Sequence, residues 1–319
     1  MPAGNHPTVH LSRRQFLARS TAAATVLLAG RRAAWAADTA GAAPLRLAFF
    51  TDVHTRLEWD TPQALQLAAA AINAERPDVI LCGGDVITEG YESASATVAP
   101  RWDAYFEHLH RRLAAPVHVA LGNHDVVAVQ PADGAPAAAD PRAEFRARFA
   151  LARTYYSFDL RGYHVIVLDP LELTTDEPRY RGFVSPDQLA WLRADVQALD
   201  PRTPIILMTH IPLLTAFYQA TAGATTAAPA NRVVVNSADV LAALADRNLL
   251  LVLQGHLHVN ELLRWRDTTF ITGGAVSGKW WRGGWHGTEE GFGMVEIAAG
   301  RVDWRYVDYG WQARRPAGV

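Results

Sequence analysis

Residues 45–54 read LRLAFFTDVH, in which an apolar, strand-like run at residues 45–50 is followed by a carboxylate and an imidazole two residues apart. Four later segments repeat this arrangement of an apolar run followed by oxygen or nitrogen donors. The runs cover residues 79–81, 117–121, 205–208 and 249–253, and the donor segments are Gly83-Gly84-Asp85, Gly122-Asn123-His124-Asp125, His210 and Gly255-His256-Leu257-His258. Because α/β sheets present their chemical groups at strand ends, the sequence predicts one functional edge built from all five segments.

The regular alternation of these runs with helical segments indicates an α/β fold. We expect helices at residues 62–75, 101–113, 186–199 and 238–247. The chain has 319 residues, of which 50% are hydrophobic and 19% are charged, and the motifs are spread evenly along it. These features favour one large globular domain.

The five motifs resemble, in content and order, those of the calcineurin-like metallophosphoesterase family. The family motifs read Asp-x-His, Gly-Asp, Gly-Asn-His-Asp/Glu, a lone His and Gly-His-x-His, and the resemblance spans roughly residues 45–309. It implies a metallophosphoesterase domain at residues 44–311, with a two-sheet β-sandwich flanked by α-helices and a dinuclear metal site at the strand ends. The alternating pattern at residues 292–311 then suits closing strands of the second sheet.

Asp52 and His54 are two residues apart, so the pleat of an extended chain would point both side chains the same way. A carboxylate and an imidazole together suit Fe, Mn or Zn. The resemblance implies two such ions about 3.5–4 Å apart, both bound by Asp85. By resemblance, the first ion is held by Asp52, His54, Asp85 and His258, and the second by Asp85, Asn123, His210 and His256.

The resemblance also assigns a proton-transfer role to His124, which would face the substrate without binding metal. We expect Asp125 to orient the His124 ring and to keep it cationic. The nucleophile would be a metal-bound hydroxide, formed from a water molecule whose pKa the ions lower to about 7. Purple acid phosphatases carry a tyrosine three residues after the bridging aspartate, where this chain has Thr88, so the chain looks more like the bacterial phosphodiesterase-type branch.

Three segments are candidates for substrate selection. Residues 273–287 read GGAVSGKWWRGGWHG, in which Lys279, Trp280, Arg282 and His286 suit an anionic ligand with an apolar or sugar-like part. The alternative is a glycine-rich turn whose tryptophans pack the rim of the sandwich. Residues 126–140 and 213–231 are rich in small residues, and each is either a lid or a surface excursion.

Residues 1–36 have the composition of a signal peptide. They contain five Arg and no acidic residue, an apolar stretch at 16–30 and then Ala34-Trp35-Ala36, a small-x-small cleavage site. The segment Ser12-Arg13-Arg14-Gln15-Phe16-Leu17 resembles the twin-arginine export motif. We therefore expect a twin-arginine-type signal peptide, recognition by the twin-arginine export machinery, a periplasmic or secreted protein and no stable membrane anchor. A Sec signal and a retained anchor remain the alternatives.

Removal of this segment makes the chain acidic. Thirty Lys and Arg less these five leave 25, against 32 Asp and Glu, so the mature net charge is near −7. Such a chain lacks the basic surface that extended nucleic acid requires, which leaves a small phosphoester as the expected substrate. The leading hypothesis is an exported dinuclear phosphoesterase acting on phosphodiesters, phosphomonoesters or both. The alternative is a non-catalytic metal-binding scaffold protein on the same fold, which the complete ligand set disfavours.

Overall fold

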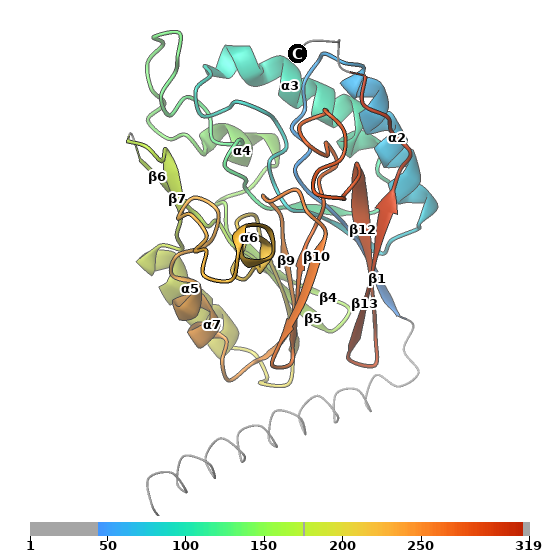
Figure 1. Cartoon of the computed structure of the whole chain (residues 1–319). Helices are drawn as coiled ribbons and strands as arrows, with labels where there is room; N and C mark the ends of the chain where they lie inside the picture. Colours follow the sequence, from blue (N-terminus) through green and yellow to red (C-terminus); the bar gives the residue numbers. More distant parts are fainter. Residues whose placement is uncertain (1–43, 175, 315–319) are drawn as a thin grey trace, which may run out of the picture.

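The computed structural model describes residues 44–174 and 176–314, so the predicted signal peptide lies outside the described residues. Two large sheets pack face to face, and helices cover their outer faces (Figure 1). The predicted two-sheet α/β sandwich flanked by helices is confirmed. No helix within the described residues is long and apolar enough to cross a membrane.

The first sheet has five strands in the order β13-β12-β1-β2-β3. Their bounds are β1 Leu45–Phe50, β2 Val79–Cys82, β3 Val117–Val119, β12 Gly291–Ala298 and β13 Arg301–Asp308. β1, β2 and β3 are mutually parallel, while β12 pairs antiparallel with both β1 and β13. The strands of the chain's tail therefore extend the first sheet from β1. The expectation that they close the second sheet is wrong, because alternation predicts strands but does not select their partners.

The second sheet has six strands in the order β10-β11-β9-β8-β5-β4. Their bounds are β4 Tyr156–Leu160, β5 Tyr163–Val167, β8 Pro204–Thr209, β9 Asn248–Gln254, β10 Glu261–Trp265 and β11 Thr268–Thr272. The four inner strands are parallel, and the edge strands β4 and β10 pair antiparallel with their neighbours. A small hairpin, β6 Leu171–Leu173 with β7 Tyr180–Gly182, lies outside both sheets.

Alternate residues of the central strands belong to two different hydrophobic clusters. In β1, Leu47 and Phe49 belong to the cluster between the sheets, whereas Ala48 and Phe50 belong to the cluster under the helices. β8 divides its buried side chains in the same way. Each large apolar side chain buried on either face contributes about 1.5–3 kcal/mol to the stability of the fold. Packing on both faces therefore holds the parallel strands in place, and with them the starting points of the loops that follow.

Two helix pairs cover the outer faces (Figure 1). α2 (Thr61–Ala74) and α3 (Ser95–His108) lie on the first sheet, and α5 (Pro186–Gln197) and α7 (Ser237–Ala243) lie on the second. α3 begins six residues before the expected start and continues through Pro100, with Val98 and Trp102 buried. The short helices η1 (His110–Arg112), α4 (Ala143–Arg148) and α6 (Phe217–Ala222) have too few turns to show a period in sequence.

Candidate metal centre

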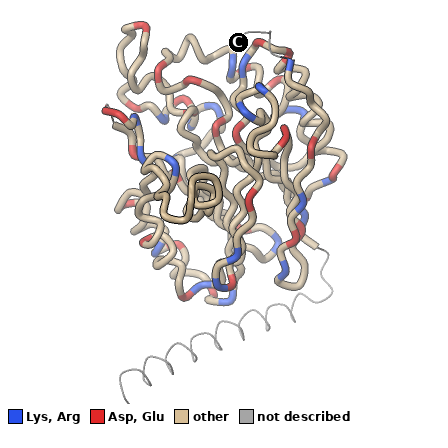
Figure 2. Tube along the Cα trace, viewed as in Figure 1, with Lys and Arg blue, Asp and Glu red and all other residues tan. Residues whose placement is uncertain are grey.

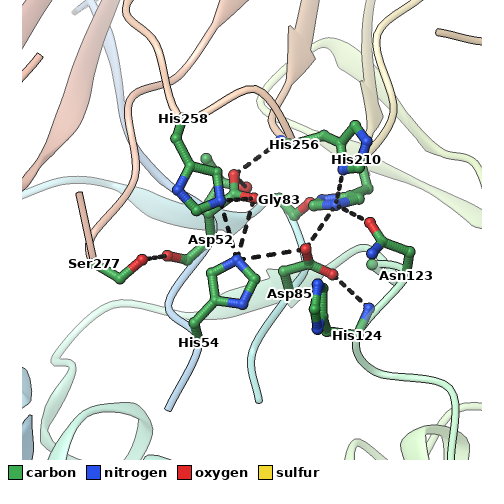
Figure 3. A network of polar contacts seen from close by, with 12 residues as sticks. Asp52, His54, Gly83, Asp85, Asn123, His124, His210, His256, His258 and Ser277 are labelled. Atoms are coloured by element: carbon green, nitrogen blue, oxygen red, sulfur yellow. Dashed lines mark hydrogen bonds and ion pairs between the residues drawn. The ribbon is translucent and has the colours of Figure 1, made fainter. Parts of the chain in front are cut away.

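The five predicted strand ends meet at one edge of the sandwich, where their polar side chains face one another (Figure 3). Two groups of donors form there. Asp52, His54 and His258 make the first, while Asp85, His210 and His256 make the second. All six side chains are at most 4% exposed, and Asn123, at 5%, adjoins the second group. Buried charged and imidazole groups at this density need compensation by an ion or by each other.

The first group is spaced like ligands around a single small ion. His258 Nε2 lies 3.0 Å from His54 Nε2 and 3.2 Å from Asp52 Oδ1. His54 Nε2 lies 3.8 Å from Asp52 Oδ1 and 3.6 Å from Asp85 Oδ2. Ligands at about 2.0–2.1 Å from a tetrahedral ion lie about 3.3–3.4 Å apart, so a first-row ion fits among these atoms.

The second group converges on one nitrogen. His210 Nε2 lies 3.1 Å from Asp85 Oδ2, 3.1 Å from Asn123 Oδ1 and 3.2 Å from His256 Nδ1. Asp85 thus lies between the two groups, with the same oxygen facing His54 on one side and His210 on the other (Figure 3). This placement suits a carboxylate that bridges two ions.

Backbone carbonyls fix the tautomers of three of the imidazoles. His258 Nδ1 lies 2.5 Å from Gly278 O, His210 Nδ1 lies 2.8 Å from Gly83 O, and His256 Nε2 lies 2.9 Å from Asn231 O. Each carbonyl accepts the ring's N–H, so the other nitrogen faces the centre and is the one that can bind an ion there. Outer hydrogen bonds of this kind orient metal-binding histidines.

The protonation of the centre also suits cations. Burial alone would raise the pKa of Asp52, but the electrostatic interactions of its carboxylate with His258 and His54 hold that pKa well below its usual range. Burial lowers the pKa of His54 to about 4. Asp52 Oδ1 is buried without a hydrogen-bond donor among the described residues. An anionic oxygen without a donor, beside the neutral His54 ring, is a fitting environment for a metal ion.

His210 is the exception among these histidines. Its burial opposes protonation, but the charge of Asp85 and a hydrogen bond with it raise the His210 pKa to about 9. In the metal-free protein this ring therefore carries the proton that partly compensates Asp85. An ion bound at His210 Nε2 would displace that proton, so metal uptake here is coupled to proton release.

The backbone reaches this arrangement through left-handed residues and not through an extended pleat. Asp52, His54, Asp85, His256 and His258 have φ values between 45° and 71°. Left-handed non-glycine residues cost about 1–3 kcal/mol each and persist only where the surroundings impose them. Asp52 and His54 do point to one place, but the pleat predicted for them is wrong, because β1 ends at Phe50.

Two motif glycines allow the segments to approach this closely. A Cβ atom at Gly122 would clash with the backbone nitrogen and side-chain Oδ1 of Asp85, and one at Gly255 would clash with Thr51 Oγ1. The clash at Gly122 cannot be relieved without moving Asp85, whose Oδ1 also accepts the His124 N–H at 2.8 Å. The Cβ at Gly255 would also clash with Asp52 Oδ2, another donor of the centre. These glycines set the spacing of the centre.

His124 lies beside the centre, and its ring is edge-on to His54 with 4.7 Å between the ring centroids. Its Nδ1 accepts the Glu89 N–H at 3.2 Å, which favours a neutral ring with the proton on Nε2. Burial lowers the His124 pKa, with Asp85 opposing the shift. The expectation of a cationic ring held by Asp125 is therefore not met.

Asp125 has a different task. Its Oδ1 accepts the Val86 and Ile87 N–H groups at 2.7 and 3.2 Å, and its Oδ2 accepts the Gly122 N–H at 2.9 Å. Within the described residues its carboxylate has no hydrogen bond to the His124 ring. Asp125 thus ties the loop after β3 to the loop after β2, because backbone donors consume both of its oxygens.

The tryptophan-rich segment contacts the centre through its aromatic rings. Trp280 lies against His258 and His54, at centroid distances of 4.7 and 5.8 Å. The buried Trp281 donates its Nε1–H to His54 O at 3.0 Å. Residues 273–287 therefore combine both roles that the sequence left open. Trp281 packs and supports a candidate ligand, while the half-buried Trp280 lies beside the candidate ligands.

The polar residues of this segment diverge. Lys279 Nζ lies 4.2 Å from the Trp285 ring centroid, whereas the Arg282 guanidinium lies 5.9 Å from the Trp59 ring. His286 is exposed and packs edge-on against Phe217 in α6. The side chains of Lys279 and Arg282, both predicted to suit an anionic ligand, therefore lie over different tryptophan rings and not together.

A pocket of about 140 Å³ opens beside His256 and His258. Its walls include Phe217 and Tyr218, so part of the segment 213–231 borders the site. Arg232 also lines this pocket, and our sequence reasoning missed it. A signal for it was available, since Arg232 is the only charged residue between His210 and Asp239.

Comparisons with known proteins identify the family and the fold. The family model described as calcineurin-like phosphoesterase matches residues 45–260. No curated protein sequence matches the chain. Among solved structures, a dimetal phosphatase from Danio rerio superposes with a TM-score of 0.59 at 16% identity, covering 84% of this chain and 100% of that one.

Two further structures show the same fold. A purple acid phosphatase from yellow lupin seeds has a TM-score of 0.55 at 14% identity, covering 83% of this chain and 52% of its own. GAP50, the anchor in the inner membrane complex of Plasmodium, has a TM-score of 0.53 at 14% identity, with coverages of 84% and 85%. At such identities these likenesses establish the fold alone.

Proposed function

Because the chain belongs to the calcineurin-like phosphoesterase family, we propose that it is a dinuclear metal-dependent phosphoesterase acting on small phosphodiesters and phosphomonoesters. The observation that carries the proposal is the pair of buried donor groups joined by Asp85. Carbonyl-fixed histidines and an oxygen without a donor aim at the same centre. Two ions of Fe, Mn or Zn in these groups would supply Lewis acidity and lower the pKa of a water molecule for attack on phosphorus.

Asp52, His54, Asp85 and His258 would hold one ion, and Asp85, Asn123, His210 and His256 the other. His124 supplies the proton. In hydrolysis the water oxygen bonds to phosphorus, the bond from phosphorus to the leaving oxygen breaks, and that oxygen departs as an alcohol. The N–H at His124 Nε2 is the donor for that oxygen, and the proton released by the water restores the ring.

The alternative hypothesis is a non-catalytic scaffold protein on the same fold. GAP50 is described as an anchor, so the fold alone does not decide between catalysis and anchoring. In this chain the complete donor set and His124 favour catalysis, because burying so many polar groups costs free energy that an anchor has no need to spend. Lys and Arg residues are interspersed with Asp and Glu (Figure 2), which favours small substrates over extended nucleic acid.

The proposal is tested by a panel of phosphomonoesters, diesters and cyclic nucleotides, assayed with the chelator-treated protein after addition of Mn, Fe or Zn. We expect hydrolysis that requires added metal and that Asp85→Ala abolishes. Bound metal without turnover on any member of the panel would favour the scaffold reading.

We also propose export by the twin-arginine route to the periplasm or the medium, on the sequence of residues 1–36. Arg13→Lys combined with Arg14→Lys should hold the precursor in the cytoplasm, because that route requires the paired arginines. N-terminal sequencing of the exported wild type should begin at or near Ala37. Normal export of the double variant would instead indicate the Sec route.

A further inference from the structure

The pocket beside the metal centre combines aromatic walls with one cation. Four aromatic side chains line it: Phe217, Tyr218, Trp280 and Trp285. Its volume, about 140 Å³, is close to that of an engineered 150 Å³ cavity that binds benzene. The pocket therefore has room for about one six-membered ring, and rings of this kind pack favourably against aromatic walls.

Arg232 supplies the charge of this pocket. Its side chain is half-buried, and within residues 44–174 and 176–314 its guanidinium has no ion-pair or hydrogen-bond partner. The preceding carbonyl, Asn231 O, accepts the Nε2–H of His256 at 2.9 Å, which fixes the backbone at this position relative to the centre. A partly desolvated guanidinium without a counter-ion favours an anionic ligand, and its fork of donors suits a carboxylate or a phosphate.

The position of the pocket indicates which part of a substrate enters it. His256 and His258 line the pocket, whereas His124, Asp85 and Asn123 do not. Figure 3 shows His256 and His258 across the donor cluster from His124. A leaving group that takes its proton from His124 therefore departs on the opposite side, and the pocket is left to the substituent that stays on phosphorus.

We propose that Arg232 determines specificity by binding an anionic group on the retained substituent, and that the preferred substrates are phosphodiesters whose retained substituent is a flat ring carrying a negative charge. This inference rests on the proposed function, since it assigns the substrate class of the same site. It replaces Lys279 and Arg282 with Arg232 as the main charge-selecting residue. Lys279 lies over Trp285, and Arg282 lies near Trp59.

The test compares one neutral diester with two carboxylated diesters that have the same leaving group. Phenyl 4-nitrophenyl phosphate has a neutral retained ring, and 3- or 4-carboxyphenyl 4-nitrophenyl phosphate has a charged one, while all release 4-nitrophenolate. Of the two carboxylated diesters, the metal-loaded wild type should hydrolyse the better one with a kcat/KM about tenfold to a hundredfold above that of the phenyl diester. The difference should lie mainly in KM. Arg232→Gln should remove that preference, Arg232→Lys should keep part of it, and the remote, exposed Arg193→Gln should leave it unchanged.

A binding measurement gives an independent readout. Calorimetry with carboxyphenylphosphonate and phenylphosphonate should show tighter binding of the carboxylated probe to wild type and equal binding of both to Arg232→Gln. No preference in wild type would overturn the inference, and so would an equal loss on both diesters in Arg232→Gln, which would place Arg232 on the scissile phosphate. Loss of the preference in Lys279→Gln alone would overturn it as well. Failure of wild type to hydrolyse any of the diesters would contradict the proposed function itself.

Discussion

Replacement of His124 by alanine separates proton donation from metal binding. The His124 backbone N–H, and not its ring, donates to Asp85 Oδ1 at 2.8 Å, and alanine retains that bond. The ring's hydrogen bond from the Glu89 N–H lies at an exposed residue, where water can replace the lost acceptor. His124→Ala should therefore keep the donor groups in place while it removes the proton donor.

The expected loss depends on the leaving group. A positioned general acid contributes about 10²–10⁴-fold, which corresponds to about 3–5 kcal/mol of transition-state stabilisation. The full loss should appear with alkyl esters, whose alkoxides need a proton. Nitrophenyl esters should lose far less, because nitrophenolate departs without one. The assay is kcat/KM for a series of diesters of increasing leaving-group pKa, at matched metal content.

The control is His118→Ala, which removes a histidine stacked on Phe158 at 3.7 Å, outside the donor groups. It should leave the dependence on leaving-group pKa unchanged. Equal losses for alkyl and nitrophenyl esters in His124→Ala would refute proton donation and leave His124 a binding role. Loss of metal in that variant would refute the structural premise.

Three further outcomes follow from the structure. Asp125→Asn should lower the free energy of unfolding by about 1–3 kcal/mol, because an amide N–H₂ group would face the Gly122 N–H that Oδ2 now accepts. It should not alter the dependence of the rate on leaving-group pKa, and an altered dependence would restore Asp125 as the partner of His124. Asp85→Ala should lose both ions and Asn123→Ala mainly one by elemental analysis, and two ions retained in Asp85→Ala would rule out the bridging assignment. Burial opposes protonation of His164, but hydrogen bonds with Asp195 and Asp159 raise its pKa above the ordinary 6.5. The contribution of protonated His164 to the stability of the folded state is therefore complete below pH 6.5 and is lost as pH rises through the raised pKa. In urea unfolding, the wild type should thus lose about 1 kcal/mol more than His164→Gln between pH 6 and 9, and parallel pH profiles would contradict this.

The sequence was sufficient to predict the strands that carry the donors and the edge where they meet. β1 has the predicted bounds, and the other four predicted runs lie in β2, β3, β8 and β9 to within a residue or two at each end. The reason is physical: strands buried on both faces read as continuous apolar runs, and the donors follow them directly. The partners of β12 and β13 were not predictable in this way, because strand pairing depends on contacts far apart in the chain.

The details of the centre depended on features that a sequence does not display. The left-handed backbone at Asp52 and His54 is imposed by neighbouring loops, as in the bond from His54 N to Asp85 O at 2.9 Å. Asp125 was assigned to its sequence neighbour, His124, although its oxygens are filled by backbone donors from residues 86, 87 and 122. Arg232 belongs to no motif, and although its isolation among uncharged residues is visible in the sequence, the pocket that it lines is not.

The phosphoesterase activity that we propose requires two ions shared through Asp85. The most direct test of this requirement is a metal titration of the chelator-treated protein, with hydrolysis of a nitrophenyl phosphodiester and bound metal followed together. We expect activity to rise to a plateau at two equivalents per chain, with metal uptake releasing protons at pH 7–8 because the His210 pKa is raised to about 9. Full activity at one equivalent, or activity in the metal-free protein, would contradict it.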